Sequence, residues 1–239
     1  MTERFYTPDL PAEQILLLSG SEAHHLLHVL RIETGQQVEL FDGRGTIAAA
    51  RVGRRTRDSV ALEILSTHQT PAAEPSKIHL ATAVPKGDRF RLLVEKVTEL
   101  GVDSLIPLTT ARSVVVPRPG KLHKLRQTVI AACKQSGRNR LMEIRECIGW
   151  TDLIAAGFPN RTVCVAHPSG ESVADCIDSL AADRPVLLCV GPEGGFTDEE
   201  IAAASTAGGR VVSLGRNILR IETAAIALCA FWTWQQKRE

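Results

Sequence analysis

The sequence predicts an α/β protein in which a parallel-sheet domain follows a small β-rich domain. Three observations support this class. From Lys77 onward, short apolar segments typical of buried strands alternate with segments of helical periodicity. Before residue 70, the apolar segments are short, alternate with polar residues and are separated by turns. Glycine-bearing loops also follow two of the later strands, over 191–196 and 214–220, where neighbouring parallel strands form a crevice.

The first 70 residues predict short strands and one helix. Residues 37–41 alternate apolar and polar side chains and run into the turn residues Asp42-Gly43. Further strands are expected over 46–52 and 59–65, and a helix over 22–30. The polar stretch 67–75 contains two prolines and is the best linker candidate. We therefore expect a domain over 1–70, a linker over 71–76 and a second domain over 77–239.

The second domain is expected to alternate strands and helices. In the helix expected over 88–100, Phe90, Leu93 and Val97 recur at helical spacing and Gly101 ends the pattern. Thr197 and Glu200 predict a capping box at the start of a later helix. The strands are expected over 78–84, 105–108, 161–166, 186–190 and 211–213, and the other helices over 121–135, 171–180, from 197, and over 221–234. This alternation is typical of a parallel sheet.

The charge is uneven although the net charge is only +1. Residues 112–145 hold nine Lys or Arg against one acid, Glu143, and residues 44–57 hold five arginines and no acid. Because a guanidinium group matches phosphate bidentately, this bias favours a nucleic-acid partner. The alternative interpretation is that these residues form solvated loops and a solvated helix face.

The chain lacks the sequence motifs that are typical of several other classes of protein. The chain has no dinucleotide-binding G-x-G-x-x-G after an early strand, no phosphate-binding G-x-x-x-x-G-K-[ST] and no G-x-S-x-G elbow. His24 and His28 share a helix face without a third ligand, so we expect no metal. The six cysteines form no C-x-x-C pair and are expected to be buried, reduced thiols. No apolar run is long enough for a membrane span and no signal pattern opens the chain, which predicts a cytoplasmic protein.

Two long motifs identify a family. Gly191-Pro192-Glu193-Gly194-Gly195-Phe196 and Leu214-Gly215-Arg216-Asn217-Ile218-Leu219-Arg220-Ile221-Glu222-Thr223-Ala224 resemble the RsmE family of 16S ribosomal RNA uracil-N3 methyltransferases, in the SPOUT (α/β-knot) superfamily. The resemblance also takes in 24–31, 86–89, 95–101 and 135–138, and so covers nearly the whole chain. It implies a parallel-sheet SPOUT α/β trefoil-knot domain, a small N-terminal PUA-like β-barrel for RNA, and a homodimer that binds S-adenosylmethionine. Its expected substrate is 16S ribosomal RNA or the small ribosomal subunit.

The chemistry of the cofactor suits the two loops. S-adenosylmethionine has an adenine, a ribose and a sulfonium, so its site needs backbone groups that read adenine and apolar side chains that enclose it. A loop beginning at His167 is expected to form a third wall. The expected cofactor-binding residues are His167, Gly191, Glu193, Gly194, Gly195, Leu214, Gly215, Ile218, Leu219, Arg220 and Thr223. The expected RNA-binding residues are Arg31, Arg44, Arg51, Arg54, Arg55, Lys86, Arg89, Arg112, Gln135, Arg138 and Arg140.

Methylation at N3 of uracil requires loss of an imide proton. The negative charge that develops on the flanking carbonyl oxygens would be stabilised by an arginine, for which Arg220 is the first choice. Glu222 or Glu193 would accept the proton, although Glu222 is equally explained as a carboxylate at a helix start. Two alternatives stay open. The first is another RNA methylation in the same superfamily, such as one on a ribose 2′-hydroxyl, and the second is a non-enzymatic RNA-binding assembly factor.

Overall fold

The computed structural model describes residues 2–10, 14–70, 78–117, 119–158, 160–178 and 184–236. By its internal contacts the chain divides into two compact units, of which the first comprises residues 1–72 with 133–141 and the second comprises 73–132 with 142–239. The expected linker at 71–76 lies outside the described residues. Residues 133–141 belong to the first unit by their contacts, although the sequence analysis placed them within 77–239.

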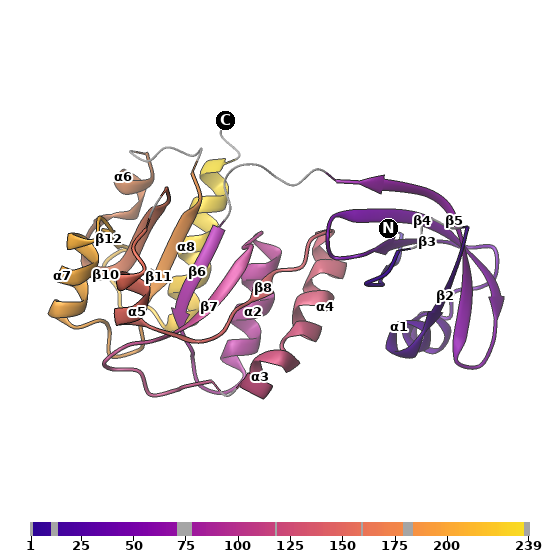
Figure 1. Ribbon diagram of the computed structural model, residues 1–239, viewed down its shortest axis with the longest axis horizontal. Coiled ribbons are helices and arrows are strands. Elements are labelled where there is room, and N and C mark those ends of the chain that lie inside the picture. The colour runs from indigo at the N-terminus through magenta and orange to yellow at the C-terminus, as the bar shows by residue number, and fades with distance from the viewer. Residues whose placement is uncertain are drawn as a thin grey trace. The chain divides into compact units, whose positions relative to one another are not determined.

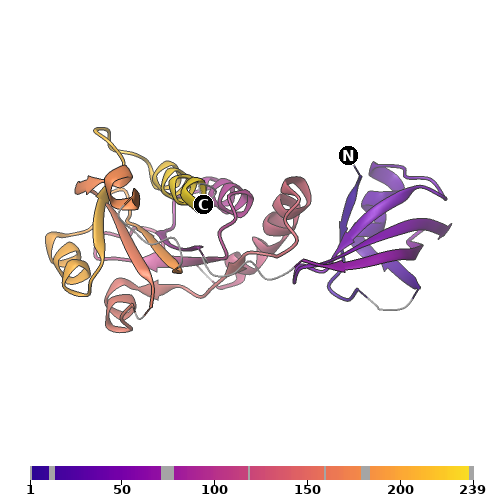
Figure 2. The same cartoon turned by 90° about the horizontal axis from the view of Figure 1, so that it is seen from above.

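The first unit is built on a curved, mixed five-stranded sheet (Figures 1 and 2). Its order is β1-β3-β4-β5-β2, with β1 parallel to β3 and the other neighbours antiparallel. Phe5, Leu26, Leu40 and Leu62 are fully buried in its core. The elements are β1 (Arg4–Tyr6), β2 (Ile15–Ser19), α1 (Gly20–His24), the π-helix η1 (His25–Val29), β3 (Gln37–Phe41), β4 (Thr46–Arg55) and β5 (Ser59–Gln69).

The helix predicted over 22–30 changes type in its middle. It begins as α1 and continues as a π-helical turn, in which the Leu30 backbone N–H donates to the carbonyl of His25 over 2.9 Å. Arg31 follows with a φ of 54°, in the left-handed region that a non-glycine residue rarely adopts. Periodicity does not distinguish an α-helical turn from a π-helical one, because both place apolar side chains on one face.

The second unit contains a parallel sheet in the order β12-β10-β11-β6-β7-β8, with β9 also paired to β7. α5 and α7 cover one face around Trp150 and Phe196, and α2 packs against α8 on the other (Figure 2). The elements are β6 (Ile78–Ala83), α2 (Arg89–Glu99), β7 (Ser104–Thr109), α3 (Pro119–Lys124), α4 (Arg126–Ser136), β8 (Glu143–Ile144), β9 (Ile148–Gly149), α5 (Trp150–Ala155), β10 (Thr162–Ser172), α6 (Val173–Asp178), β11 (Val186–Val190), α7 (Asp198–Thr206), β12 (Arg210–Ser213) and α8 (Ile221–Gln236). The last residues of α4, 133–136, belong to the first unit by their contacts.

Two predicted elements of this unit need correction. The single helix expected over 121–135 is two helices, α3 and α4, which meet at Leu125. The strand expected over 161–166 continues to Ser172, with a bulge opposite Val212, so the helix expected from 171 begins at Val173. The bulge lets Gly170 approach Val212 so closely that a Cβ at Gly170 would lie 2.5 Å from the Val212 nitrogen.

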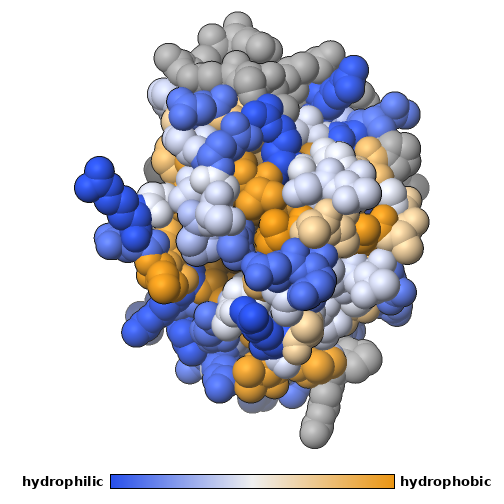
Figure 3. Space-filling model, turned by 90° about the vertical axis from the view of Figure 1, so that its left-hand side faces the viewer, coloured by the Kyte–Doolittle hydropathy of each residue, from blue (hydrophilic) through white to orange (hydrophobic). Residues whose placement is uncertain are grey.

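The surface at the end of this unit that carries α6 and α7 is mixed in polarity. Apolar side chains gather near the middle of this face and hydrophilic side chains surround them (Figure 3). Among the described helices, none has the length and apolar character that crossing a membrane requires.

Candidate cofactor and reaction site

A pocket of about 250 Å³ lies where β10, β11 and β12 end. Its three walls come from the β10 bulge, the loop after β11 and the loop between β12 and α8. The volume is near the lower end of small-molecule sites, which measure roughly 300–1,000 Å³. The lining residues are Arg112, Ala166, His167, Pro168, Val190, Gly191, Pro192, Glu193, Gly194, Gly195, Phe196, Ser213, Leu214, Gly215, Asn217, Ile218, Leu219, Ile221 and Ala224.

The backbone conformation and close packing of the two loops require glycine at three positions. Gly195 has a φ of +70° and Gly215 a φ of +119°, a region that glycine adopts without the steric cost of a Cβ. Gly191 needs its small size for another reason, because a Cβ there would lie 2.9 Å from the Phe196 ring. The loops therefore bring bare backbone groups to the pocket wall.

The loop after β11 is held from both sides. Arg112 Nη1 donates to the Gly194 carbonyl over 2.8 Å and lies 3.5 Å from the Phe196 carbonyl. Glu200 closes the predicted capping box, accepting from the Thr197 backbone N–H over 2.9 Å, and also accepts from the Ala111 N–H over 2.8 Å. The segment around Arg112 is thereby fixed both to the loop after β11 and to the start of α7.

An ionic cluster lies at the edge of the pocket. Arg89, the first residue of α2, has one guanidinium nitrogen 3.9 Å from Glu193 Oε1 and another 3.7 Å from Glu222 Oε1. Glu193 lines the pocket and its side chain is 44% exposed, whereas the Glu222 side chain is only 8% exposed. Glu222 Oε2 is buried and has no hydrogen-bond partner among the described residues. The cluster therefore combines one accessible carboxylate, one buried carboxylate and a shared cation.

Nine of the eleven expected cofactor residues line this pocket, namely His167, Gly191, Glu193, Gly194, Gly195, Leu214, Gly215, Ile218 and Leu219. Arg220 and Thr223 do not: both are exposed, and they lie at and just inside the start of α8. The sequence analysis missed Arg112, which it assigned to RNA, and the strand-end residues Ala166, Val190 and Ser213. The strand-end positions could have been inferred from the predicted strands, but the position of Arg112 could not.

The thiol beneath the pocket is inert. Cys189 precedes the lining residue Val190 and is fully buried. Burial raises the pKa of its thiol to about 12, so it stays neutral at physiological pH. All six cysteines are free, and five of them are buried, as expected.

The arginines expected to bind RNA in the first unit do not form one patch. Arg44 lies in the β3–β4 turn, and Arg54 and Arg55 lie at the far end of β4, about 30 Å away at a strand's rise per residue. The loop after Arg31 joins the Arg54–Arg55 end, since the Thr34 hydroxyl donates to the Gly53 carbonyl. All of these arginines are exposed, as is Arg51, which pairs with Glu63 at 3.3 Å.

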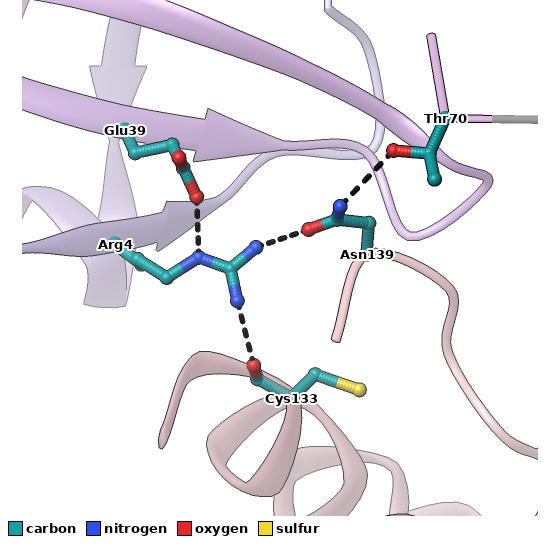
Figure 4. A network of polar contacts seen from close by, with 5 residues as sticks. All are labelled: Arg4, Glu39, Thr70, Cys133 and Asn139. Carbon is teal, nitrogen blue, oxygen red and sulfur yellow. Dashed lines mark hydrogen bonds and ion pairs between the residues drawn. The ribbon is translucent and has the colours of Figure 1, made fainter. Parts of the chain in front are cut away.

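The segment 133–141 uses its polar groups to join the first unit. Arg4 donates to Glu39 Oε1, to the Cys133 carbonyl and to Asn139 Oδ1, and Asn139 in turn donates to Thr70 Oγ1 (Figure 4). Arg140 donates to the Thr70 carbonyl. Arg140, which was expected to contact phosphate, packs its guanidinium on Gly45 and uses it within the unit.

The remaining expected RNA residues differ in accessibility. Lys86 and Gln135 are exposed, and Arg138 is partly buried. Arg89 and Arg112 lie at the pocket, as described above. Within the described part of the chain, no group of three or more acidic, His or Cys side chains is arranged to hold a metal ion.

The comparisons with known proteins agree with this architecture. A model of the RNA methyltransferase domain matches residues 72–233, and a model of the RNA methyltransferase PUA domain matches residues 18–65. Fold and pocket thus define an RNA methyltransferase with an attached PUA domain.

The relatives narrow this class. Ribosomal RNA small subunit methyltransferase E of Mycobacterium bovis is 32% identical over 234 residues, covering 92% of this chain and 87% of the relative. The Bacillus subtilis protein of that name is 29% identical over 87% of this chain and 86% of its own. A solved Ribosomal RNA small subunit methyltransferase E from Neisseria gonorrhoeae, bound to S-adenosyl methionine, superposes with a TM-score of 0.87 at 31% identity, covering 97% and 96% of the two chains. This chain belongs to the ribosomal RNA small subunit methyltransferase E (RsmE) family.

Family membership confirms three predictions. The fold is a SPOUT-like, parallel-sheet α/β methyltransferase domain with a PUA domain, and the class of enzyme is an S-adenosylmethionine-dependent ribosomal RNA methyltransferase. The predicted cofactor is confirmed at the level of the family, since a methyltransferase from Legionella pneumophila, 34% identical with a TM-score of 0.86, was also solved with it.

Proposed function

We propose that this protein methylates N3 of a uridine in 16S ribosomal RNA, with S-adenosylmethionine held in the pocket at the ends of β10, β11 and β12. The observation that carries this proposal is the position of the Arg89–Glu193–Glu222 cluster directly beside a glycine-walled pocket. A base and a cation are needed to ionise an imide, and both are available there.

The pocket fits the cofactor by the chemistry of its walls. The backbone of Gly191, Gly194 and Gly215 presents N–H and C=O groups that can read the edge of an adenine. Leu214, Ile218 and Leu219 supply apolar surface on either side. When bound, S-adenosylmethionine supplies an electrophilic methyl group, which moves to N3 as its bond to sulfur breaks and the sulfur keeps the electron pair.

The protein's own side chains act on the uracil. The N3–H bond breaks and its proton passes to a carboxylate, Glu193 or Glu222, so that N3 carries the electron pair that attacks the methyl group. The charge left on the ring spreads over the flanking carbonyl oxygens, and Arg220 is exposed next to the lining residue Leu219 to stabilise it. Because N3 lies on the pairing edge, the target uridine must be unpaired or flipped out.

RNA binding is assigned to the first unit and to exposed basic residues of the second. Arg31, Arg54 and Arg55 would contact phosphates, and Lys86 would contact RNA near the reaction site. We further propose that the enzyme works as a homodimer through α8. This substrate places its work in the cytoplasm, where small subunits are assembled and used.

The proposal is tested by methyl transfer to naked 16S RNA and to small subunits from a strain that lacks the enzyme. Mass analysis of the digested RNA should locate the added methyl group on a uracil base. A methyl group on a ribose 2′-hydroxyl would show that the protein methylates ribose and not the uracil base. Tight RNA binding without S-adenosylmethionine binding in a calorimetric titration would indicate a non-enzymatic assembly factor.

A further inference from the structure

We infer that Arg89 and Glu193 together read the pairing edge of the target uracil, and that the buried Glu222 is the positioning residue that holds Arg89 in place. This inference deepens the proposed function and rests on it. It assigns different roles to the two candidate carboxylates. It also assigns Arg89 to the reacting base instead of to the RNA phosphates.

The orientation of Arg89 is set by the start of α2. Its Nε donates to the Lys86 carbonyl over 3.3 Å, across the turn that contains Gly87 at a φ of +67°. This hydrogen bond directs the two terminal nitrogens toward Glu193 and Glu222. At 3.9 and 3.7 Å these contacts are ion pairs rather than hydrogen bonds, so the terminal N–H groups retain the capacity to donate to a ligand.

Glu222 is suited to hold a cation and not to take a substrate proton. Its side chain is more than nine-tenths buried, in the first turn of α8, where the helix dipole favours a negative charge. Burying a carboxylate is costly unless a cation faces it, and Arg89 is the cation that faces it. Its Oε2 is buried and has no hydrogen-bond partner among the described residues, and its Oε1 pairs with Arg89.

Glu193 is suited to meet the base. It lines the pocket, it lies in the loop that Arg112 fixes, and nearly half of its side chain is exposed. The guanidinium of Arg89 lies 3.9 Å from its carboxylate, so a donor and an acceptor lie next to each other at the edge of the pocket.

That pair is complementary to uracil. The pairing edge of uracil presents a carbonyl oxygen, the N3–H donor and a second carbonyl oxygen. Glu193 would accept the N3–H while an Arg89 N–H donates to the adjacent carbonyl oxygen. When the N3–H bond breaks, its proton goes to Glu193, and the charge that appears on the carbonyl oxygen already faces Arg89. Cytosine presents an unprotonated N3, which would face the Glu193 carboxylate without a hydrogen bond, so the pair also selects uracil over cytosine.

The decisive experiment compares Arg89→Ala with Arg91→Ala in the full-length protein. Arg91 lies on the same helix, is exposed and belongs to no part of the site described above. We expect Arg89→Ala to lower kcat for methyl transfer at least 100-fold, while the RNA affinity, its salt dependence and the S-adenosylmethionine affinity stay within twofold. Arg91→Ala should leave all four quantities within twofold.

Two further variants separate positioning from folding. Glu222→Asp keeps the charge and should retain more of kcat than Glu222→Gln, which keeps the shape, and neither should change KM for RNA more than twofold. Glu193→Gln should lose kcat as severely as Arg89→Ala, because an amide cannot take the proton. If Arg89→Ala does not fold, as judged by circular dichroism, Arg89→Lys carries the same test, since a lysine keeps one charge but cannot face both carboxylates.

The outcomes distinguish a failure of the proposed function from a failure of the roles inferred for Arg89, Glu193 and Glu222. If the wild-type enzyme leaves the N3 of uridine unmodified, the proposed function fails and the inference fails with it. If the wild-type enzyme is active but the Arg89 variant keeps kcat and loses RNA affinity with a shallower salt dependence, only the inference fails. In that case Arg89 contacts phosphate.

Discussion

Arg112 and Gly194 are joined by a hydrogen bond of 2.8 Å from the guanidinium Nη1 to the backbone carbonyl oxygen. The two residues lie in different loops, and a Cβ at Gly194 would come within 3.3 Å of the Arg112 side chain. An arginine in a basic stretch, which was expected to bind RNA, therefore supports the wall of the pocket.

Replacing Arg112 should weaken cofactor binding. Arg112→Ala removes a charge-assisted hydrogen bond to the loop, worth about 1.5 kcal/mol, the low end for such bonds because the position is exposed, or about tenfold in affinity. We expect the dissociation constant for S-adenosylmethionine, measured by calorimetry, to rise by that factor. A shallower salt dependence of RNA binding with unchanged cofactor affinity would restore the original assignment of Arg112 to phosphate.

Gly195 and Gly208 form a matched pair for testing the pocket. Both have positive φ, +70° and +89°, and at both positions a Cβ would meet open space, but only Gly195 lines the pocket. A valine at either position should cost at least about 1–2 kcal/mol of stability from backbone strain. Only Gly195→Val should abolish S-adenosylmethionine binding. Equal cofactor affinities for the two folded variants would show that the 191–196 loop is not the cofactor wall.

The parts of this structure that were predicted depend on local sequence. Helix periodicity gives α2, the pair Thr197 and Glu200 gives the capping box of α7, and glycines with positive φ mark the two loops. These signals depend only on residues that are close together in the sequence, so they can be read from the sequence alone. The nine expected cofactor residues that line the pocket lie in such local motifs, in the β10 bulge and the two loops.

The parts that were missed depend on contacts between distant segments. β8 and β9 have two residues each, which is too short for any periodicity, and they exist because they pair with β7. The pairing of Arg4 with Asn139 and of Arg89 with Glu222 joins residues far apart in the chain. Basic residues near each other in sequence were expected to act together, but folding assigned Arg112, Arg140 and Arg54 to three different environments.

The buried thiol Cys189 should make the protein less stable at high pH. Burial raises the pKa of this thiol from its usual 9.0 to about 12, so the unfolded chain ionises first as the pH rises. The stabilisation is complete below pH 9 and is lost between about pH 9 and 12, at about 1.4 kcal/mol per pH unit. Denaturant melts should show a shallower decline in the free energy of unfolding for Cys189→Ala over this range. An identical pH dependence in both proteins would contradict the assignment.

Arg54 and Arg55 should carry part of the RNA affinity. Both are exposed at one end of β4. Replacing both by glutamate should weaken RNA binding and reduce the slope of log affinity against log salt by roughly 1.4–1.8, at about 0.7–0.9 per lost phosphate contact. Arg140→Ala is the contrasting variant, because its contact with Thr70 should make the loss one of stability, with an unchanged salt slope. If only Arg140→Ala changes the slope, the RNA surface lies elsewhere.

The last helix, α8, carries an exposed stripe that we expect to form the dimer interface. Leu228, Cys229 and Trp232 are buried on one side, where the helix packs within its own unit. The opposite side leaves Phe231 40% and Trp234 57% exposed, three residues apart and therefore on one face. Large apolar groups gathered on one helix face are typical of a surface that another molecule covers.

Phe231→Glu combined with Trp234→Glu should convert a dimer into a monomer in sedimentation at micromolar concentration. Ile15→Glu is the control, because Ile15 is also exposed, at 67%, but lies on the first unit. If RNA bound to the first unit of one chain reaches the pocket of its partner, the inactive Gly195→Val variant can be mixed with the weakly binding Arg54→Glu/Arg55→Glu variant, at an RNA concentration where the latter alone shows little activity. The mixture should restore about a quarter of wild-type activity, since half of the reassembled dimers are mixed and each has one intact site. A wild-type protein that sediments only as a monomer would remove both the interface and the shared site, whereas a dimer without complementation would place each RNA and its cofactor on the same chain.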